Sequence, residues 1–198
     1  MKKLFLLAIA LLPVLGVNAV EFKYEFDVDK NPLDVFYLDK NMQANKNCVL
    51  EPYDDVWILK NKNVNAGMVL WKRMSSGKIT LKGGLQQGGI RIFACFDVKS
   101  GKGVAAHVIN HFSGKVRLLS TLTGKNEVLA EGNLKKSVDD LVLTLELTDD
   151  MLKVYEGDTL VCEAKRPENA KNGVIGFMGT WGTKMKLEEI SISAPSLR

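Results

Sequence analysis

Apolar and polar residues alternate along much of this chain, most clearly in its last third. From Leu141 to Leu147 every second residue is leucine, and the residues between them are valine, threonine and glutamate. A period of two places one apolar and one largely polar edge on a half-buried β-strand. Met151 to Glu156 resumes the pattern, and Gly157-Asp158 predicts a turn into a further strand at Thr159 to Ala164. This part of the chain is therefore expected to be β-sheet.

The rest of the chain carries the same pattern in runs of similar length. Glycine, asparagine and aspartate separate the runs, and β-branched and aromatic residues crowd them, which favours strands over helices. A short helix is expected only around Pro32 to Leu38. The strands expected before residue 140 are Glu21 to Asp29, Trp57 to Lys60, Gly67 to Met74, Ile79 to Leu81, Ile90 to Val98, Val104 to Phe112, Val116 to Leu122 and Glu127 to Glu131. Strands at this spacing predict an all-β fold, an antiparallel sandwich of two sheets.

One irregularity is expected in the last strand. Met185 and Leu187 share one parity, whereas Ile190 and Ile192 have the other. If all four side chains face the core, the strand must absorb an extra residue near Glu188-Glu189. A β-bulge is the smallest change of the backbone that does this.

The first 19 residues have the pattern of an export signal. Lys2 and Lys3 form a basic start, an apolar run follows from Leu4 to Val17, and Val17-Asn18-Ala19 supplies the compact residues that signal peptidases recognise. A retained membrane anchor is the weaker alternative, because the run is shorter than the roughly 20 residues that span a bilayer. Cleavage after Ala19 would leave residues 20–198 as a single domain of a secreted or periplasmic protein.

The net charge and the cysteine content argue against two classes of function, nucleic-acid binding and zinc binding. Removal of Lys2 and Lys3 lowers the formal net charge from +4 to +2. The basic residues are also scattered, so nucleic-acid binding is not expected. Cys48, Cys95 and Cys162 are an odd number, so at least one thiol has no partner within the chain. Buried, unpaired cysteines are favoured over a bridge, and no two cysteines have the close spacing of a zinc site.

From about Gly89 onward, the order of strands and turns resembles the concanavalin A-like lectin/glucanase superfamily. The likeness is strongest to its LamG-type modules and to secreted bacterial domains named for 3-keto-disaccharide hydrolysis. It is carried by the segments "GIRIFACFDV", "GKVRLLSTLTGKNEVLAEG", "LVLTLELTDDMLKVYEGDTLVCEA" and "GVIGFMGTWGTKMKLEEISIS". The resemblance implies a jelly-roll sandwich of two curved sheets, whose concave sheet binds sugar in carbohydrate-active members. The Phe-Asn-Gly-Lys-type opening of the hydrolase-named domains is absent, which weakens transfer of their activity.

Aromatic and basic side chains on these segments are candidates for sugar contact. Trp71 and Trp181 could stack on the apolar faces of sugar rings, with core packing as the alternative for each. Arg91 could donate hydrogen bonds to hydroxyl groups. His107 and His111 are the only histidines and are expected to share one face of one strand. They are interpreted as partly exposed strand residues, polar sugar contacts or, in an enzyme, proton-transfer groups.

Acidic residues give weaker signals. Glu25, Asp27 and Asp29 share a strand face, close to the carboxylate pattern of retaining glucanases in the superfamily. A solvated face of a half-exposed strand is the favoured interpretation. Loop pairs of aspartates occur at Asp54-Asp55, Asp139-Asp140 and Asp149-Asp150. None has the density of a strong calcium site, so no obligatory metal or cofactor is expected.

Three hypotheses follow. The first is a secreted lectin-like domain that binds a glycan on its concave sheet through Trp71, Arg91, His107, His111 and Trp181. The second is a glycoside hydrolase or lyase in which His107 or His111 acts with a carboxylate that remains to be identified. The third is a protein-interaction module, recognisable by an exposed apolar patch. Convergence of Arg91 and both histidines in one groove would favour the sugar hypotheses, and a carboxylate bonded to a histidine would favour an enzyme.

Overall fold

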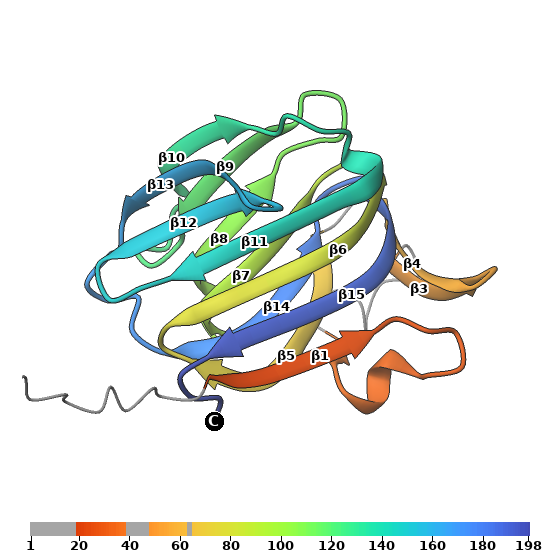
Figure 1. Cartoon of the computed structure of the whole chain (residues 1–198), viewed down its shortest axis with the longest axis horizontal. Helices are drawn as coiled ribbons and strands as arrows, with labels where there is room; N and C mark the ends of the chain where they lie inside the picture. Colours follow the sequence, from red (N-terminus) through yellow and green to blue (C-terminus); the bar gives the residue numbers. More distant parts are fainter. Residues whose placement is uncertain (1–18, 39–47, 63–64) are drawn as a thin grey trace, which may run out of the picture.

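The computed structural model of the chain describes residues 19–38, 48–62 and 65–198. These residues form two antiparallel sheets packed face to face (Figure 1). The strand order in the eight-stranded sheet is β13-β12-β11-β6-β15-β4-β3, with β1 also paired to β15. The order in the seven-stranded sheet is β10-β9-β8-β7-β14-β5-β2. The predicted all-β, two-sheet jelly-roll sandwich is confirmed.

The element bounds agree with most of the expected strands. The eight-stranded sheet consists of β1 (Val20–Glu25), β3 (Cys48–Tyr53), β4 (Val56–Asn61), β6 (Gly77–Gln87), β11 (Leu141–Leu147), β12 (Met151–Glu156), β13 (Thr159–Lys165) and β15 (Lys184–Ala194). The seven-stranded sheet consists of β2 (Tyr37–Leu38), β5 (Ala66–Met74), β7 (Ile90–Asp97), β8 (Lys102–Val108), β9 (Lys115–Ser120), β10 (Glu127–Asn133) and β14 (Gly173–Gly179). Two short 3-10 helices, η1 (Pro32–Asp34) and η2 (Val138–Asp140), lie in connections.

The apolar positions of the alternating pattern fill the space between the sheets. In the seven-stranded sheet, Ile92, Ala106 and Leu118 are in register on three neighbouring strands, and all three are fully buried. Ile79 and Leu145 form the corresponding pair in the eight-stranded sheet. Burial of each leucine or isoleucine side chain stabilises the fold by about 1.5–3 kcal/mol. A one-residue slip of any strand would lose that contribution at every position, so the core fixes the register.

β15 contains the expected bulge. Its register on β6 shifts between Leu187 and Glu189, so Glu188 is the extra residue. The carbonyl of Glu188 accepts a hydrogen bond from the Phe26 N–H at 2.8 Å. Before the bulge β15 pairs with β4, and after it with β1. The predicted β-bulge is confirmed, and it marks the point where the strand changes its neighbour.

Three strand predictions need correction. The strand expected over Glu21 to Asp29 ends at Glu25, so Asp27 and Asp29 do not share a strand face with it. The strand expected over Val104 to Phe112 ends at Val108, because the chain turns there and Asn110 Oδ1 accepts a hydrogen bond from the Ser113 N–H at 2.8 Å. The strand expected over Ile79 to Leu81 instead covers Gly77–Gln87. Its internal glycines do not end it. A Cβ at Gly84 would lie 2.7 Å from the Asp139 carbonyl oxygen, so glycine there permits a close approach to η2.

The structure also tests the prediction that the cysteines are buried and do not form a bridge. Cys48, Cys95 and Cys162 are buried and no disulfide joins them, as the sequence favoured. Burial raises the pKa of the Cys162 thiol to about 11.

The export-signal prediction falls on residues 1–18, outside the described residues, and on Ala19. No helix in the described part of the chain is long and apolar enough to cross a membrane.

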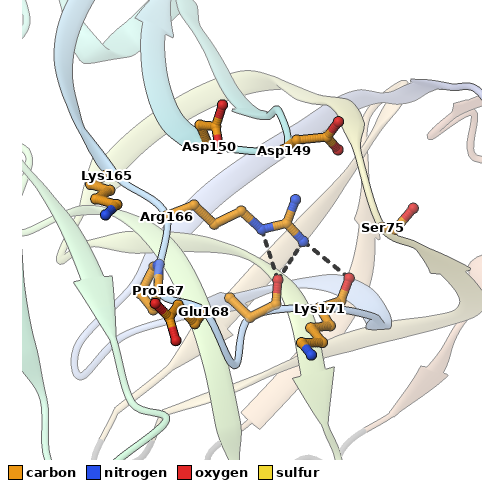
Figure 2. Close-up of a pocket in the computed structure, with 9 residues that line it drawn as sticks. Ser75, Asp149, Asp150, Lys165, Arg166, Pro167, Glu168 and Lys171 are labelled. Atoms are coloured by element: carbon orange, nitrogen blue, oxygen red, sulfur yellow. Dashed lines mark hydrogen bonds between the residues drawn. The ribbon is translucent and has the colours of Figure 1, made fainter.

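The loop between β13 and β14 is organised by Arg166 (Figure 2). Its Nε donates to the Ala170 carbonyl at 2.7 Å, and its Nη2 donates to the Lys171 carbonyl at 3.0 Å. Its Nη1 donates to the Thr148 carbonyl at 2.7 Å, next to the end of β11. Asp149 and neighbouring side chains border a polar concavity of about 430 Å³ beside this arginine. Because its donors are used by backbone carbonyls, Arg166 has a structural role in joining this loop to the β11–β12 turn.

Arg166→Met is expected to lower the free energy of unfolding by about 2 kcal/mol, because charge-assisted hydrogen bonds to three carbonyls are lost. Lys165→Met is the matched control, since Lys165 is exposed at the neighbouring position. Urea unfolding at neutral pH measures both variants. Equal stability of the two variants would contradict the structural role.

Candidate functional site

The outward face of the seven-stranded sheet carries a row of polar side chains. Successive side chains on a strand point to opposite faces, so the neighbours of the buried row described above point outward. These neighbours are Arg91 on β7, His107 on β8 and Arg117 on β9, which are in register with one another. The register continues to Met178 on β14 and to Glu131 on β10. We call the residues Arg91, His107, Arg117 and Glu131 the polar row.

The same face is hollowed into a groove of about 380 Å³, a size typical of small-molecule sites. Most of the side chains that line it are apolar, and Arg91 also lines it. The apolar lining consists mainly of Val69, Phe93, Phe96, Val98, Ala105 and Met178.

Two phenylalanines shape this groove. The Phe93 and Phe96 rings pack with centroids 4.5 Å apart. The register of β7 on β8 shifts between them, where Cys95 takes a positive φ of 51°. A Cβ at Gly176 would lie 2.4 Å from the Phe93 ring, and a Cβ at Gly103 would lie 3.0 Å from Phe96. Glycines on the two neighbouring strands therefore make room for both rings.

Arg91 is a cation without an anionic partner among the described residues. In the described part of the chain it forms no ion pair or hydrogen bond, and its Nε is buried. Burial lowers the pKa of its guanidinium, but arginine remains protonated in proteins. A positive charge therefore lies partly buried beside the groove.

His107 faces Arg91 across the β7–β8 pair and is only 8% exposed. Its Nε2 is buried and has no hydrogen-bond partner in the part of the chain that the structure describes. Burial, followed by the positive charges of Arg91 and Arg117, lowers the pKa of His107 from 6.5 to about 3. The imidazole is therefore neutral at physiological pH and can donate or accept one hydrogen bond through Nε2.

The carboxylate of the polar row is already engaged. Glu131 lies 2.5 Å from Arg117 Nε and 2.7 Å from Lys115 Nζ. The hydrogen bond from Lys115 and then that from Arg117 hold the pKa of Glu131 below its usual value. No carboxylate within the described ranges is hydrogen bonded to His107 or His111. Among the described residues, neither histidine therefore has the carboxylate partner that would favour an enzyme.

An exposed aromatic pair lies on the same face, near the edge of the sheet. Trp71 follows Val69 by two residues on β5 and is 50% exposed. Its ring centroid is 5.7 Å from that of Tyr37, at an interplanar angle of 74°. Tyr37 lies opposite Val69 in the β2–β5 pairing. Sequence reasoning missed Tyr37, because the segment around it carries a helix signal instead of an alternating pattern.

His111 and Trp181 lie apart from the polar row. His111 follows the end of β8, and its backbone N–H donates to the Gly88 carbonyl at 2.9 Å. Trp181 lies in the turn between β14 and β15. Together with Phe112 they border a second concavity of about 400 Å³. The expectation that His107 and His111 share one face of one strand is therefore wrong, because β8 ends at Val108 and His111 falls in the turn that follows.

The carboxylates at the start of the chain lie on the opposite sheet. Glu25 ends β1, which pairs with β15, and its side chain is exposed and bonded to Lys23 at 2.7 Å. Asp27 lies in the turn that follows, where its Oδ1 accepts a hydrogen bond from the Asp29 N–H. These positions agree with a solvated face. Across residues 19–38, 48–62 and 65–198, no group of three or more His, Cys, Asp and Glu side chains could hold a metal ion.

Comparison with known proteins identifies a fold. No protein-family model matches the chain, and no curated protein matches it. Among solved structures it is similar to the carbohydrate-binding module CBM66 from Bacillus subtilis, at 16% identity and a TM-score of 0.61. That match covers 73% of this chain and 91% of the module.

Two further matches cover more of the chain. A protein of unknown function with a galectin-like fold from Bacillus subtilis is 13% identical, with a TM-score of 0.67, over 89% of this chain and 97% of that protein. A β-1,3-1,4-glucanase (lichenase) derived from a mouse hindgut metagenome is 10% identical, with a TM-score of 0.64, over 89% of this chain and 99% of the enzyme. At such identities the likeness concerns the fold alone. The fold is similar to that of the carbohydrate-binding module, the galectin-like protein and the glucanase.

Proposed function

We propose that this protein binds an oligosaccharide on the outward face of its seven-stranded sheet. The composition of this face carries the proposal: it combines two exposed aromatic rings, an apolar groove and two polar side chains with unused hydrogen-bonding atoms. Sugar rings present apolar C–H faces and polar hydroxyl edges, so a surface that binds them needs both kinds of contact. A carbohydrate-binding module and a glucanase among the proteins of similar fold support the same proposal.

The two kinds of contact lie at different places on the sheet. In the proposed complex, Trp71 and Tyr37 support the apolar face of one sugar ring, and Arg91 and His107 bond the hydroxyl groups of another. Strand spacing of about 4.8 Å and a rise of about 3.3 Å per residue separate these pairs by roughly 15–20 Å. A chain of several sugar units spans this distance, whereas a monosaccharide reaches one pair only.

Binding without cleavage is favoured over hydrolysis. Glycoside hydrolysis ordinarily uses two carboxyl groups, roughly 5–10 Å apart, on either side of the scissile bond. Glu131, the carboxylate of the polar row, is held by two cations. Because the pKa of His107 is lowered to about 3, the residue is a neutral imidazole at neutral pH and not the imidazolium that acts as a general acid.

The protein-interaction hypothesis draws on a different surface. Phe112 is 88% exposed and Trp181 is 70% exposed, and both border the second concavity. Exposed aromatic side chains that gather in one place are typical of docking sites. A substitution at this second concavity therefore tests whether the sugar binds there and not on the seven-stranded sheet.

Trp71→Ala is expected to weaken glycan binding about five- to tenfold, because loss of an aromatic contact with a sugar ring costs about 1 kcal/mol. A glycan-array screen would supply the ligand, and isothermal titration calorimetry would measure the dissociation constant. Tyr53→Ala is the matched control, since Tyr53 is 54% exposed on β3 of the other sheet. Loss of binding in Trp181→Ala with full binding in Trp71→Ala would move the site to the second concavity.

His107 should make the fold less stable as the pH falls below about 6.5. The unfolded chain binds a proton at His107 below this pH, whereas the folded protein resists protonation until about pH 3. Urea unfolding at about pH 4.5 should therefore show a loss of about 2 kcal/mol, relative to neutral pH, that the His107→Gln variant lacks. His111→Gln is the control and should keep the loss. A His107 imidazole that titrates near pH 6.5 by NMR would contradict this expectation.

A further inference from the structure

We infer that the saccharide is anionic, and that a carboxylate or sulfate group on it pairs with Arg91. The inference rests on the proposed function and adds the chemical class of the ligand. The observation behind it is that the Arg91 guanidinium is partly buried and has no counter-ion among the described residues.

Two neighbouring cations on this face have a carboxylate partner, which Arg91 lacks among the described residues. Arg117 and Lys115 both pair with Glu131, although their side chains are 38% and 37% exposed. Arg91 is partly buried, as these two cations are, but has no carboxylate partner within the described residues. Removal of a charge from water without a partner is unfavourable, so buried charges are normally paired. The missing anion is therefore expected to arrive with the ligand.

His107 offers a second donor beside this guanidinium. It lies directly opposite Arg91, and Cβ atoms in such pairs are about 4.5–5.5 Å apart. The charged groups that act on His107 are Arg91 and Arg117, with no carboxylate among them. A bound oxyanion would favour the neutral tautomer that carries its proton on the unpartnered Nε2. One cation and one N–H donor are thus available to a single oxyanion.

The groove explains why the anion belongs to a larger ligand. Phe93 and Met178 line it together with Arg91, so a group held by the guanidinium lies beside apolar surface. A sugar ring that carries the anion would cover this surface with its C–H groups. The planar guanidinium matches two oxygens of a carboxylate or of a sulfate ester. A small inorganic anion would leave the groove empty.

The test compares three probes by isothermal titration calorimetry on the purified protein. They are an oligogalacturonate, the same oligosaccharide after reduction of its carboxyl groups, and a sulfated galacto-oligosaccharide. We expect at least one anionic probe to bind at least about tenfold more tightly than the reduced probe, the contribution of a charge-assisted contact. The probe that shows this preference identifies carboxylate or sulfate as the group recognised.

Three variants test whether the preference for the anionic probe depends on Arg91. Arg91→Gln should abolish the preference for the anionic probe, so that this variant binds the anionic probe no more tightly than the reduced probe. Lys153→Gln removes the same charge from β12 of the other sheet and should keep the preference. Arg91→Lys keeps the charge without the planar fork and should keep part of the preference. Circular dichroism and the unfolding midpoint report whether each variant is folded.

The outcomes separate this inference from the proposed function. Equal binding of the anionic and reduced probes would overturn the inference and leave the proposed function standing. Equal loss of both probes in Arg91→Gln would make Arg91 a contact for hydroxyl groups and would overturn the inference in the same way. Failure of all three probes and of a glycan array would overturn the proposed function, and the inference with it.

Discussion

The alternation of side chains across the seven-stranded sheet is the constraint on which the candidate site depends. Ile92, Ala106 and Leu118 are in register and fully buried between the sheets. Their burial fixes which face each neighbouring residue takes, because the side-chain period of a strand is two. Arg91 and His107 are therefore neighbours on the outward face as a consequence of core packing. The stability of the core and the geometry of the site have the same origin.

Local departures from the regular sheet turn this face into a groove. The shift of register at Cys95 presents Phe93 and Phe96 on the same face, and Gly103 and Gly176 leave room for their rings. Bulges occur often beside functional sites, where they redirect side chains. The groove therefore depends on a register shift in β7 and on glycines of the two neighbouring strands. Uncompensated charge at Arg91 is a further departure, and in the proposed complex the ligand offsets it.

Periodicity predicted most of the strands, the two-sheet fold and the bulge at Glu188, because burial repeats every second residue along a strand, but it missed β3. It failed at His111, since a two-residue pattern continues by chance into a turn that side-chain hydrogen bonds of Asn110 define. The missing partner of Arg91 depends on distances between strands remote in sequence. Such distances follow from topology, which periodicity does not determine.

The central claim is that the ligand lies on the outward face of the seven-stranded sheet. Backbone-amide NMR shift mapping, with the protein titrated by a saccharide that binds on a glycan array, tests this most directly. The largest shifts are expected at Trp71, Arg91 and His107 and at their neighbours on β5, β7 and β8. Shifts confined to the concavity at His111 and Trp181, with the sheet unaffected, would contradict the claim.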